Sequence, residues 1–247
     1  MTTIPTAATV TTMTNAAIME KKPKKLRHEI KYNINHAEAM ILSGRLARIM
    51  KHDDYADSHG SYRVSSLYFD TPYDKALREK LDGVRDREKF RIRYYNDDTG
   101  FIRLEKKYKT RGLCAKRSAR LTEDECMRII HGDIAFLMER GDPLLAEFYS
   151  KLRGQLLKPA RIVTYNREAF MYTPGNVRVT IDTDLATYTG TDCFFRLHDA
   201  KLDMTEGVAV LEVKYDEFIP DVVRLMIGDI GRKSTAYSKY AVARRYQ

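Results

Sequence analysis

Lysine and arginine occupy every second position along two neighbouring segments of this chain. The first run is Arg85, Arg87, Lys89, Arg91 and Arg93, and the second is Arg103, Glu105, Lys107 and Lys109. Side chains two residues apart on a β-strand point to the same side, so each segment would present one strongly charged face. Between positions 85 and 120, 13 lysines and arginines stand against five acidic residues. Like charges repel unless an anion neutralises them, which predicts a polyanionic partner: nucleic acid, anionic lipid or a phosphate chain.

Three glutamates form a second pattern, because each stands two residues before a lysine on a predicted strand. They are Glu29, Glu105 and Glu212. Carboxylates that face bound phosphates are the hard oxygen ligands that Mg²⁺ or Mn²⁺ prefers. An ion pair with a neighbouring arginine or lysine is the other interpretation of each glutamate, and it stays open. The six histidines show no metal-ligand spacing such as HxH or HExxH.

Other catalytic and targeting signals are missing from the sequence. It has no GxxxxGK[ST] phosphate loop, no GxGxxG after a strand and no GxSxG, so side chains must handle any phosphate. Three cysteines without CxxC spacing argue against a disulfide framework or a cysteine zinc site and fit a reducing cytosol. No secretory signal is recognisable, and no run approaches the roughly 18 apolar residues of a membrane helix. We therefore expect a cytoplasmic protein.

The composition is that of a globular protein, with 247 residues, 43% hydrophobic and 31% charged residues and a net charge of +9. We expect a flexible tail over residues 1–25 and a single domain over 26–247. Alternating and β-branched patterns predict strands at 27–34, 62–70, 84–96, 101–110, 113–121, 159–172, 176–184, 193–197 and 208–215. Capping signals and proline positions predict helices at 35–51, 71–80, 122–132, 143–157, 220–228 and 237–245.

Most of the predicted strands are joined as hairpins, with one hairpin loop at 97–100. This arrangement favours an α+β fold built on an antiparallel sheet or barrel. The charged face of such a sheet has two interpretations. It is either a solvated outer face, which normally mixes both signs of charge, or the polar lumen of a closed barrel around an anion. The dominance of lysine and arginine favours the lumen.

Ordered motifs along the chain are similar to those of the triphosphate tunnel (CYTH-like) superfamily. They most resemble the polyphosphate polymerase domain of the vacuolar transporter chaperone (VTC) complex and its bacterial relatives. The matching segments span about residues 26 to 241 and occur in the family's order. They are 27–32 (RHEIKY), 66–71 (SLYFDT), 89–94 (KFRIRY), 104–107 (LEKK), 165–170 (YNREAF), 177–182 (VRVTID), 211–215 (LEVKY) and 238–240 (SKY).

The resemblance implies an antiparallel eight-stranded β-tunnel, a closed barrel, with flanking helices. It implies transfer of the γ-phosphate of ATP to a growing polyphosphate chain, with Mn²⁺ or Mg²⁺ as cofactor. The implied catalytic residues are Arg91, Arg93, Lys107, Arg167 and Arg178. These five would bind phosphates together with Lys31, Ser238 and Lys239. Glu212 would hold the metal, with Glu29 and Glu105 as secondary candidates.

The implied partners are ATP and polyphosphate, with no DNA; association with a membrane partner protein and the oligomeric state stay open. Two positions depart from the family patterns. Arg27 replaces the first glutamate of the ExExK motif that opens the domain in the wider superfamily. Ala236 stands where eukaryotic polymerases have a lysine, and Lys233 is a candidate to replace that lysine. Two alternative functions remain. One is hydrolysis of a triphosphate such as tripolyphosphate in the same tunnel. The other is a non-catalytic module for polyphosphate or RNA, in which Tyr94 and Tyr95 stack on bases.

Overall fold

A computed structural model describes residues 27–110, 113–197, 201–204, 207–228 and 234–246. Its main feature is one antiparallel sheet with the strand order β1-β10-β8-β7-β3-β4-β5-β6. These strands are β1 His28–Asn35, β3 Ser61–Asp70, β4 Arg87–Tyr95, β5 Asp98–Thr110, β6 Leu113–Leu121, β7 Lys158–Tyr172, β8 Val177–Tyr188 and β10 Val208–Tyr215. Two short strands join this sheet: β2 (Lys51–His52) pairs with β7, and β9 (Lys201–Asp203) pairs with β8.

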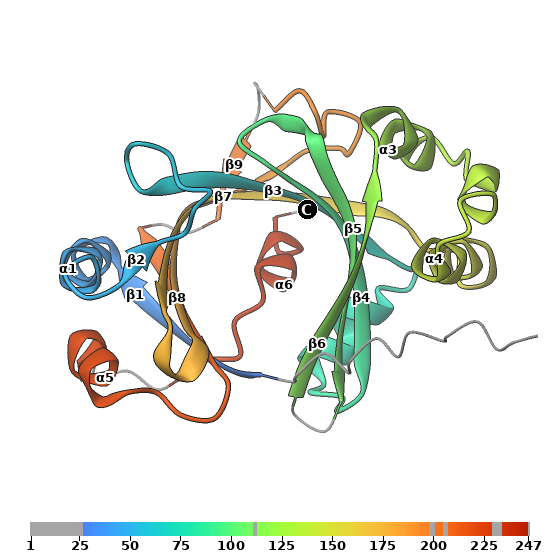
Figure 1. Cartoon of the computed structure of the whole chain (residues 1–247). Helices are drawn as coiled ribbons and strands as arrows, with labels where there is room; N and C mark the ends of the chain where they lie inside the picture. Colours follow the sequence, from blue (N-terminus) through green and yellow to red (C-terminus); the bar gives the residue numbers. More distant parts are fainter. Residues whose placement is uncertain (1–26, 111–112, 198–200, 205–206, 229–233, 247) are drawn as a thin grey trace, which may run out of the picture.

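The sheet curls into a ring, and its two edge strands are β1 and β6 (Figure 1). Within the described part of the chain, one isolated bridge between Arg27 and Cys114 links these edges. The hydrogen-bonded ladder therefore does not close. The prediction of an α+β fold on an antiparallel sheet is confirmed, but the closed barrel is not. Side chains span the seam instead, because the ammonium of Lys107 on β5 lies 3.0 Å from a carboxylate oxygen of Glu29 on β1.

Two groups of helices cover the outer face of the ring. Helix α1 (His36–Leu46) and α5 (Asp221–Ile227) pack on β1, β8 and β10, with Leu46, Val179 and Leu211 fully buried. Helices α3 (Glu123–Ile130) and α4 (Pro143–Gly154) and the 3-10 helix η1 (Ala135–Met138) cover β4, β5 and β6. The capping boxes predicted for α1, at Asn35 and Glu38, and for α3 are both confirmed.

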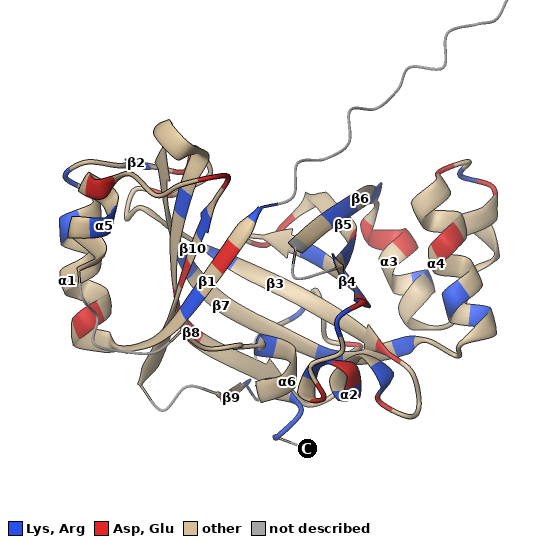
Figure 2. Cartoon of the chain, turned by 90° about the horizontal axis from the view of Figure 1, so that it is seen from below, with Lys and Arg blue, Asp and Glu red and all other residues tan. Residues whose placement is uncertain are grey.

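The C-terminal helix α6 (Lys239–Ala243) lies within the outline of the ring (Figure 1). Its Tyr240 stacks on Tyr68 of β3, with ring centroids 5.2 Å apart, and donates a hydrogen bond of 2.7 Å to Asp70. Helix α2 (Lys75–Leu81) lies beside α6 at the same end of the ring (Figure 2), where Arg244 contacts Asp74. This end of the hollow is therefore narrowed by two helices.

Four predicted local structures are wrong. The first helix ends at Leu46 instead of at 51, where β2 begins. Residues 193–197 form turns instead of a strand, because Phe194 and Phe195 both pack on Tyr94, whereas a strand would send them to opposite sides. The hairpin turn is at Asn96 and Asp97, both with positive φ, instead of at 97–100. Helix α2 begins at 75 instead of 71.

Two expectations concern the ends of the chain and the membrane. The tail predicted over residues 1–25 lies outside the described residues, as does Lys233. Within the part that the structure covers, the helices are too short and too polar to span a membrane.

Candidate functional site

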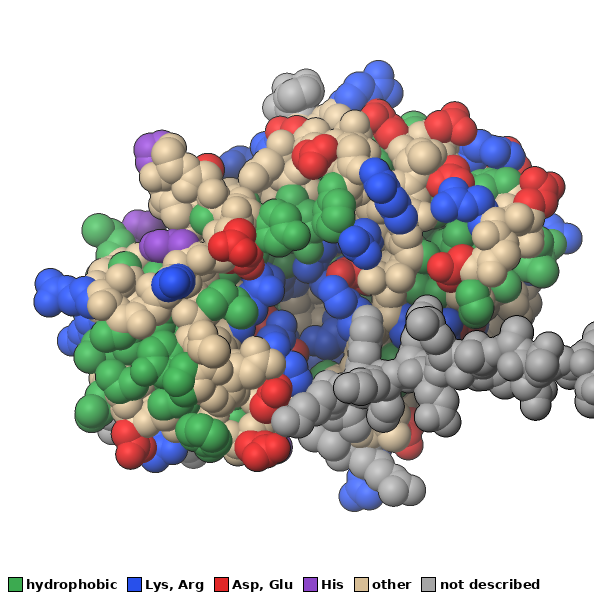
Figure 3. Space-filling model, viewed as in Figure 1, with side chains coloured by type: hydrophobic (Ala, Val, Ile, Leu, Met, Phe, Trp, Pro, Cys, Tyr) green, Lys and Arg blue, Asp and Glu red, His purple; other side chains and the backbone are tan. Residues whose placement is uncertain are grey.

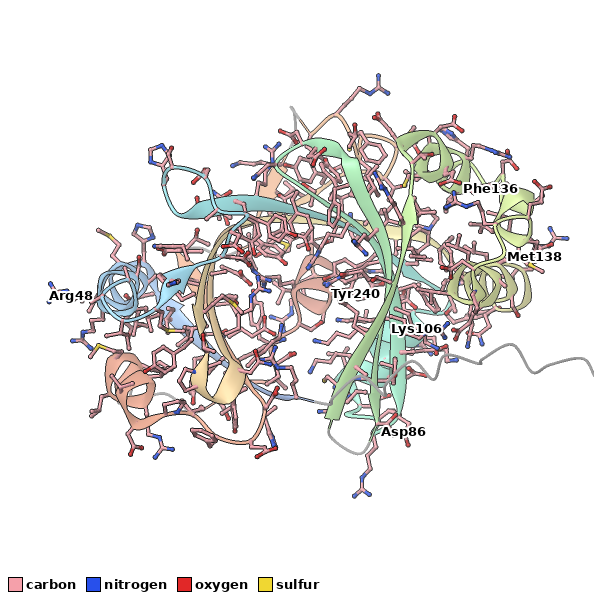
Figure 4. The ribbon with its side chains drawn as sticks, viewed as in Figure 1. Arg48, Asp86, Lys106, Phe136, Met138 and Tyr240 are labelled. Atoms are coloured by element: carbon pink, nitrogen blue, oxygen red, sulfur yellow. The ribbon has the colours of Figure 1, made fainter. Side chains whose placement is uncertain are left out.

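The alternating basic residues of β4 face the inside of the ring. The intervening residues Phe90, Ile92 and Tyr94 are buried on the other side, in the core shared with α3 and α4. On β5, Lys106 likewise points outward, where it pairs with Glu88 and with a carboxylate of α4 (Figure 4). The interpretation as a solvated outer face is therefore wrong. The lumen-facing lysines and arginines surround a hollow at the centre of the molecule (Figure 3).

Two cavities follow one another through this hollow, which we refer to as the tunnel. The wide cavity has a volume of about 450 Å³ and is lined by Arg91, Arg93, Arg167, Arg178 and Lys214, among others. The narrow cavity has a volume of about 170 Å³ and lies against α2 and the segment before α6; its lining includes Lys31, Lys80, Arg87, Lys89, Lys109 and Ser238. Both cavities are lined by Glu29 and Lys107, which therefore mark their junction.

Arg91 and Arg93 are fixed by hydrogen bonds from their guanidinium groups. Arg91 donates to one oxygen of Glu105 from Nε at 2.7 Å, with its terminal nitrogen 2.6 Å from the same oxygen. Arg93 donates to the hydroxyl groups of Ser66 at 3.0 Å and Tyr165 at 2.8 Å. Glu105 is 1% exposed. Burial opposes its ionisation, but the neighbouring arginines and Lys116 hold its pKa well below the ordinary value.

Arg167 and Lys239 share one buried carboxylate, although they come from β7 and α6. Asp182 on β8 accepts hydrogen bonds of 2.6 and 2.8 Å from Arg167, and the ammonium of Lys239 lies 2.6 Å from it. Burial disfavours the charged aspartate, but these two cations lower its pKa to about 2. The ammonium of Lys239 also lies 4.7 Å from the ring centre of Tyr165, a cation–π contact. The C-terminal segment therefore reaches the tunnel.

At the junction, three lysines surround two glutamates. Lys31 lies 2.9 Å from Glu29 and 3.9 Å from Glu212, and Lys214 lies 3.0 Å from Glu212. Burial and the charge of Glu212 oppose the ionisation of Glu29, but Lys107, Lys31 and Lys214 lower its pKa to about 2. Glu212 is 5% exposed, and the same lysines hold its pKa well below the ordinary value despite its burial. Both groups are therefore carboxylates at neutral pH.

Arg178 and Ser238 hold more peripheral positions. Arg178 lines the wide cavity and donates hydrogen bonds to Asp53 at 2.6 Å and to the hydroxyl of Tyr62 at 2.9 Å. Ser238 lines the narrow cavity, and its hydroxyl accepts a hydrogen bond of 3.4 Å from the amide of Ala241, which caps α6. The structure thus brings all eight predicted phosphate-binding residues to the two cavities or to the ion pairs beside them.

The predicted metal ligands do not share one environment. Glu212 and Glu29 lie together at the junction, whereas Glu105 is engaged by Arg91 and by Lys116, 2.5 Å away. Over the described residues, three or more histidine, cysteine or acidic side chains nowhere gather into a metal-binding group. Magnesium commonly takes only one or two protein carboxylates, with phosphates and water completing its shell. The pair Glu212 and Glu29 fits that donor set, and their roles stay predictions.

Sequence reasoning missed several residues that position the site. Asp53, Asp182 and Tyr165 hold the predicted cations. Tyr165 and Asp182 lie in the matched motifs 165–170 and 177–182 without an assigned role, and Asp53 lies in none of the motifs. Lys89 belonged to the alternating pattern, and Lys214 follows Glu212 by two residues on one strand, so the sequence had already indicated the face of both lysines. Tyr94 cannot stack on bases as the RNA-binding alternative required, because it is 1% exposed and its hydroxyl donates to the Phe194 carbonyl.

The family model named VTC domain matches residues 26–246, nearly the whole chain. The chain belongs to the VTC domain family. The resemblance drawn from the sequence motifs is thereby confirmed. Members of the tunnel superfamily bind triphosphate substrates and use divalent metal ions.

A solved structure of low sequence identity shares the fold of this VTC domain. A candidate adenylyl cyclase from Hippeastrum, described as having a dominant triphosphatase activity, is 14% identical with a TM-score of 0.54, and the match covers 90% of this chain and 96% of that one. A candidate adenylate cyclase from Bacillus halodurans is 13% identical, with a TM-score of 0.47 and coverage of 83% and 88%. No curated protein matches the chain.

Proposed function

We propose that this VTC domain is a polyphosphate polymerase, which transfers the γ-phosphate of ATP to the end of a polyphosphate chain. The family and the fold support a phosphate-related function of the tunnel. The observation that carries the proposal is the pair of basic cavities that meet at Glu29 and Lys107. A polymerase must hold two phosphate chains end to end, whereas a hydrolase needs to hold only one. In this proposal the triphosphate of the nucleotide occupies the wide cavity and the acceptor chain occupies the narrow one.

For this reaction the protein must position the two phosphate groups and neutralise their negative charge. An oxygen of the terminal phosphate of the chain attacks the γ-phosphorus, the bond from that phosphorus to the β–γ bridging oxygen breaks, and ADP leaves. The attacking group is already an anion, so no general base is needed. Arg91, Arg93, Arg167 and Arg178 can each present a planar fork to phosphate oxygens, and Lys107 provides a point charge at the junction.

The carboxylates of the tunnel have two roles in this account. Glu105 and Asp182 contact arginine side chains and fix their positions, so the guanidinium groups are already oriented when phosphate arrives. Glu212, with Glu29 beside it, would hold Mn²⁺ or Mg²⁺. Such an ion, when bound, neutralises negative charge on the nucleotide's phosphates. Lys239 and Ser238 would contact phosphates from the α6 side, and Lys31 would do so at the junction.

Product analysis tests the proposal. The purified protein is incubated with ATP and Mn²⁺, and the products are separated by electrophoresis and assayed for free phosphate. Long phosphate chains together with ADP are expected. Free phosphate without chains would instead indicate a triphosphate hydrolase in the same tunnel, and the absence of any ATP consumption would indicate a module that only binds polyanions. An Arg93→Ala variant is the control for contaminating activity.

A further inference from the structure

Two tyrosine rings line the wide cavity beside its arginines. They belong to Tyr62 of β3 and Tyr95 of β4. Tyr62 is 4% exposed and its hydroxyl accepts a hydrogen bond from Arg178, whereas Tyr95 is half-buried. Figure 3 shows that apolar side chains, with tyrosine counted among them, border the hollow next to its lysines and arginines. A bound triphosphate uses only the charged groups, so the rings are left for a different part of a ligand.

Neighbouring rings hold Tyr95 in place without stacking on it. Tyr62 and Tyr95 form a T-shaped pair, with ring centroids 5.7 Å apart and 70° between the ring planes. Phe101 of β5 lies 6.3 Å from Tyr95 at 38°. Among the described residues, no ring stacks parallel on Tyr95, no lysine or arginine lies over it, and its hydroxyl has no hydrogen-bond partner. The ring is therefore fixed in direction while its face stays available to a ligand.

Two other tyrosines beside the tunnel have rings that are covered by the protein itself. The ammonium of Lys239 lies 4.7 Å from the ring centre of Tyr165. The ring of Tyr240 stacks on Tyr68, with centroids 5.2 Å apart. A flat ligand can thus occupy at Tyr95 the position that a cation or a second ring occupies at the other two.

Tyr95 lies where the base of a nucleotide would follow its phosphates. It is two residues after Arg93 on β4, about 7 Å along the strand, and Tyr94 between them points to the outer core. Burial opposes the ionisation of Tyr95, but Arg93 is near enough to lower the pKa of its hydroxyl. The hairpin turn begins directly after Tyr95, at Asn96, so Tyr95 marks the outer end of the strand. A nucleotide whose phosphates contact Arg93 can therefore direct its ribose outward and its base toward Tyr95.

We propose that Tyr95 binds the base of the nucleotide by stacking, at the outer end of the wide cavity. This inference rests on the proposed function and adds a second point of recognition to it, which inorganic tripolyphosphate lacks. Every base has an aromatic face, so stacking accepts different bases. The adjacent side chains Tyr62 and Phe101 present rings and no amide that would read the edge of the base. GTP should therefore bind about as tightly as ATP, and the smaller pyrimidine rings of CTP and UTP should bind more weakly.

The variant Tyr95→Leu tests the assignment, because it removes the aromatic face and keeps an apolar side chain. Its affinity for the β,γ-imido analogue of ATP, measured by calorimetry, should fall about 5- to 100-fold, the usual range for one lost stacking contact. Its affinity for tripolyphosphate should stay close to that of the parent, which also shows that the variant is folded. Tyr95→Phe keeps the ring and should bind both ligands like the parent.

A fluorescent nucleotide measures the stacking itself. The fluorescence of 2-aminopurine riboside triphosphate falls when its base stacks on another ring, so saturating parent protein should quench it. Saturating Tyr95→Leu should leave the probe brighter. The matched control is Tyr73→Leu, because Tyr73 is 77% exposed and lines neither cavity. This control should bind and quench the probe like the parent.

Three results would overturn the inference. They are an unquenched probe on saturated parent protein, unchanged affinity of Tyr95→Leu for the ATP analogue, and an equal loss of affinity for the analogue and tripolyphosphate, which would mean that Tyr95 supports the arginines instead of the base. The measurement on the parent does not depend on the folding of any variant. If the parent makes no polymer but Tyr95→Leu loses affinity for nucleotides alone, the polymerase proposal fails and the base site stands. If the parent makes polymer and Tyr95→Leu binds the analogue normally, the base site alone fails.

Discussion

Arg91→Ala should destabilise the fold as well as remove a phosphate ligand. The charge pattern alone suggests the opposite, because deleting one cation from a crowded basic face would relieve repulsion and hold or raise the melting temperature. The structure predicts the opposite, a lower melting temperature. Glu105 is 1% exposed and contacts the guanidinium of Arg91 at 2.6 and 2.7 Å, so the variant leaves a buried carboxylate with one partner fewer.

The size of the loss in unfolding free energy depends on which cations remain near Glu105. Removing one partner of a buried ion pair typically costs about 3–5 kcal/mol. Lys116 stays 2.5 Å from the carboxylate, but its own side chain is 49% exposed, so it compensates only in part. We therefore expect a loss of about 2–3 kcal/mol of unfolding free energy. For a chain of this size that corresponds to a melting temperature lower by roughly 4–12 °C.

Thermal and urea unfolding without nucleotide or phosphate measure this effect. The double variant Arg91→Ala/Glu105→Ala should recover part of the loss, because it also removes the uncompensated carboxylate. Arg103→Ala is the matched control. Arg103 is on the neighbouring strand, stacks 4.4 Å from the ring of Phe101 and has no carboxylate partner among the described residues. A melting temperature of Arg91→Ala at or above that of the parent would show that the Glu105 carboxylate does not depend on Arg91.

Three further predictions follow from the geometry of the tunnel. Glu212→Gln keeps the shape of the side chain but loses its charge, so Mn²⁺-dependent turnover should be lost while ATP binding persists; an unchanged Mn²⁺ titration of turnover would place the metal elsewhere. Lys239→Ala should weaken ATP binding about 10- to 100-fold, measured by calorimetry, because one charge-assisted contact to phosphate is lost. ATP affinity equal to that of the parent would show that α6 only packs against the sheet and does not bind the nucleotide. Burial, reinforced by nearby cations, lowers the pKa of Lys89 to about 7, and adjacent cations outweigh burial to lower that of Tyr68 to about 7. As the pH rises through about 7, Lys89 loses positive charge and Tyr68 gains negative charge, so tripolyphosphate should bind more weakly. The variant Lys89→Arg keeps its charge, so its affinity for tripolyphosphate should change less with pH. The same pH dependence of affinity in the parent and in Lys89→Arg would show that Lys89 is not the titrating group.

The fold was predictable where local patterns decide it. The alternation along 87–95 identified the charged face of β4, and the capping boxes at Asn35 and Thr122 placed the starts of two helices. The sequence did not predict that the hydrogen-bonded ladder stays open between β1 and β6, because the spacing of these two edge strands is set only when the whole sheet has curled into a ring. The turns at 193–197 were missed since tertiary packing of two adjacent phenylalanines on Tyr94 overrides strand propensity.

The site was predictable as a set of cations but not as a network. The motifs and the alternation pointed to Lys31, Arg91 and Lys107, and the structure brings them to the same tunnel. The partners of other cations were not predictable, because Asp53 contacts an arginine 125 residues away and Asp182 contacts a lysine of the last helix. Such pairs arise only when distant strands come into register.

The most direct test of phosphate transfer from ATP to a polyphosphate chain follows the γ-phosphate itself. The purified protein is given ATP radiolabelled at the γ-position, Mn²⁺ and an unlabelled short polyphosphate primer, and the label is traced by electrophoresis. We expect the label in chains longer than the primer, in amounts equal to the ADP formed, and we expect Arg93→Ala to abolish the transfer. Recovery of the label only as free phosphate, with primer length unchanged, would contradict it.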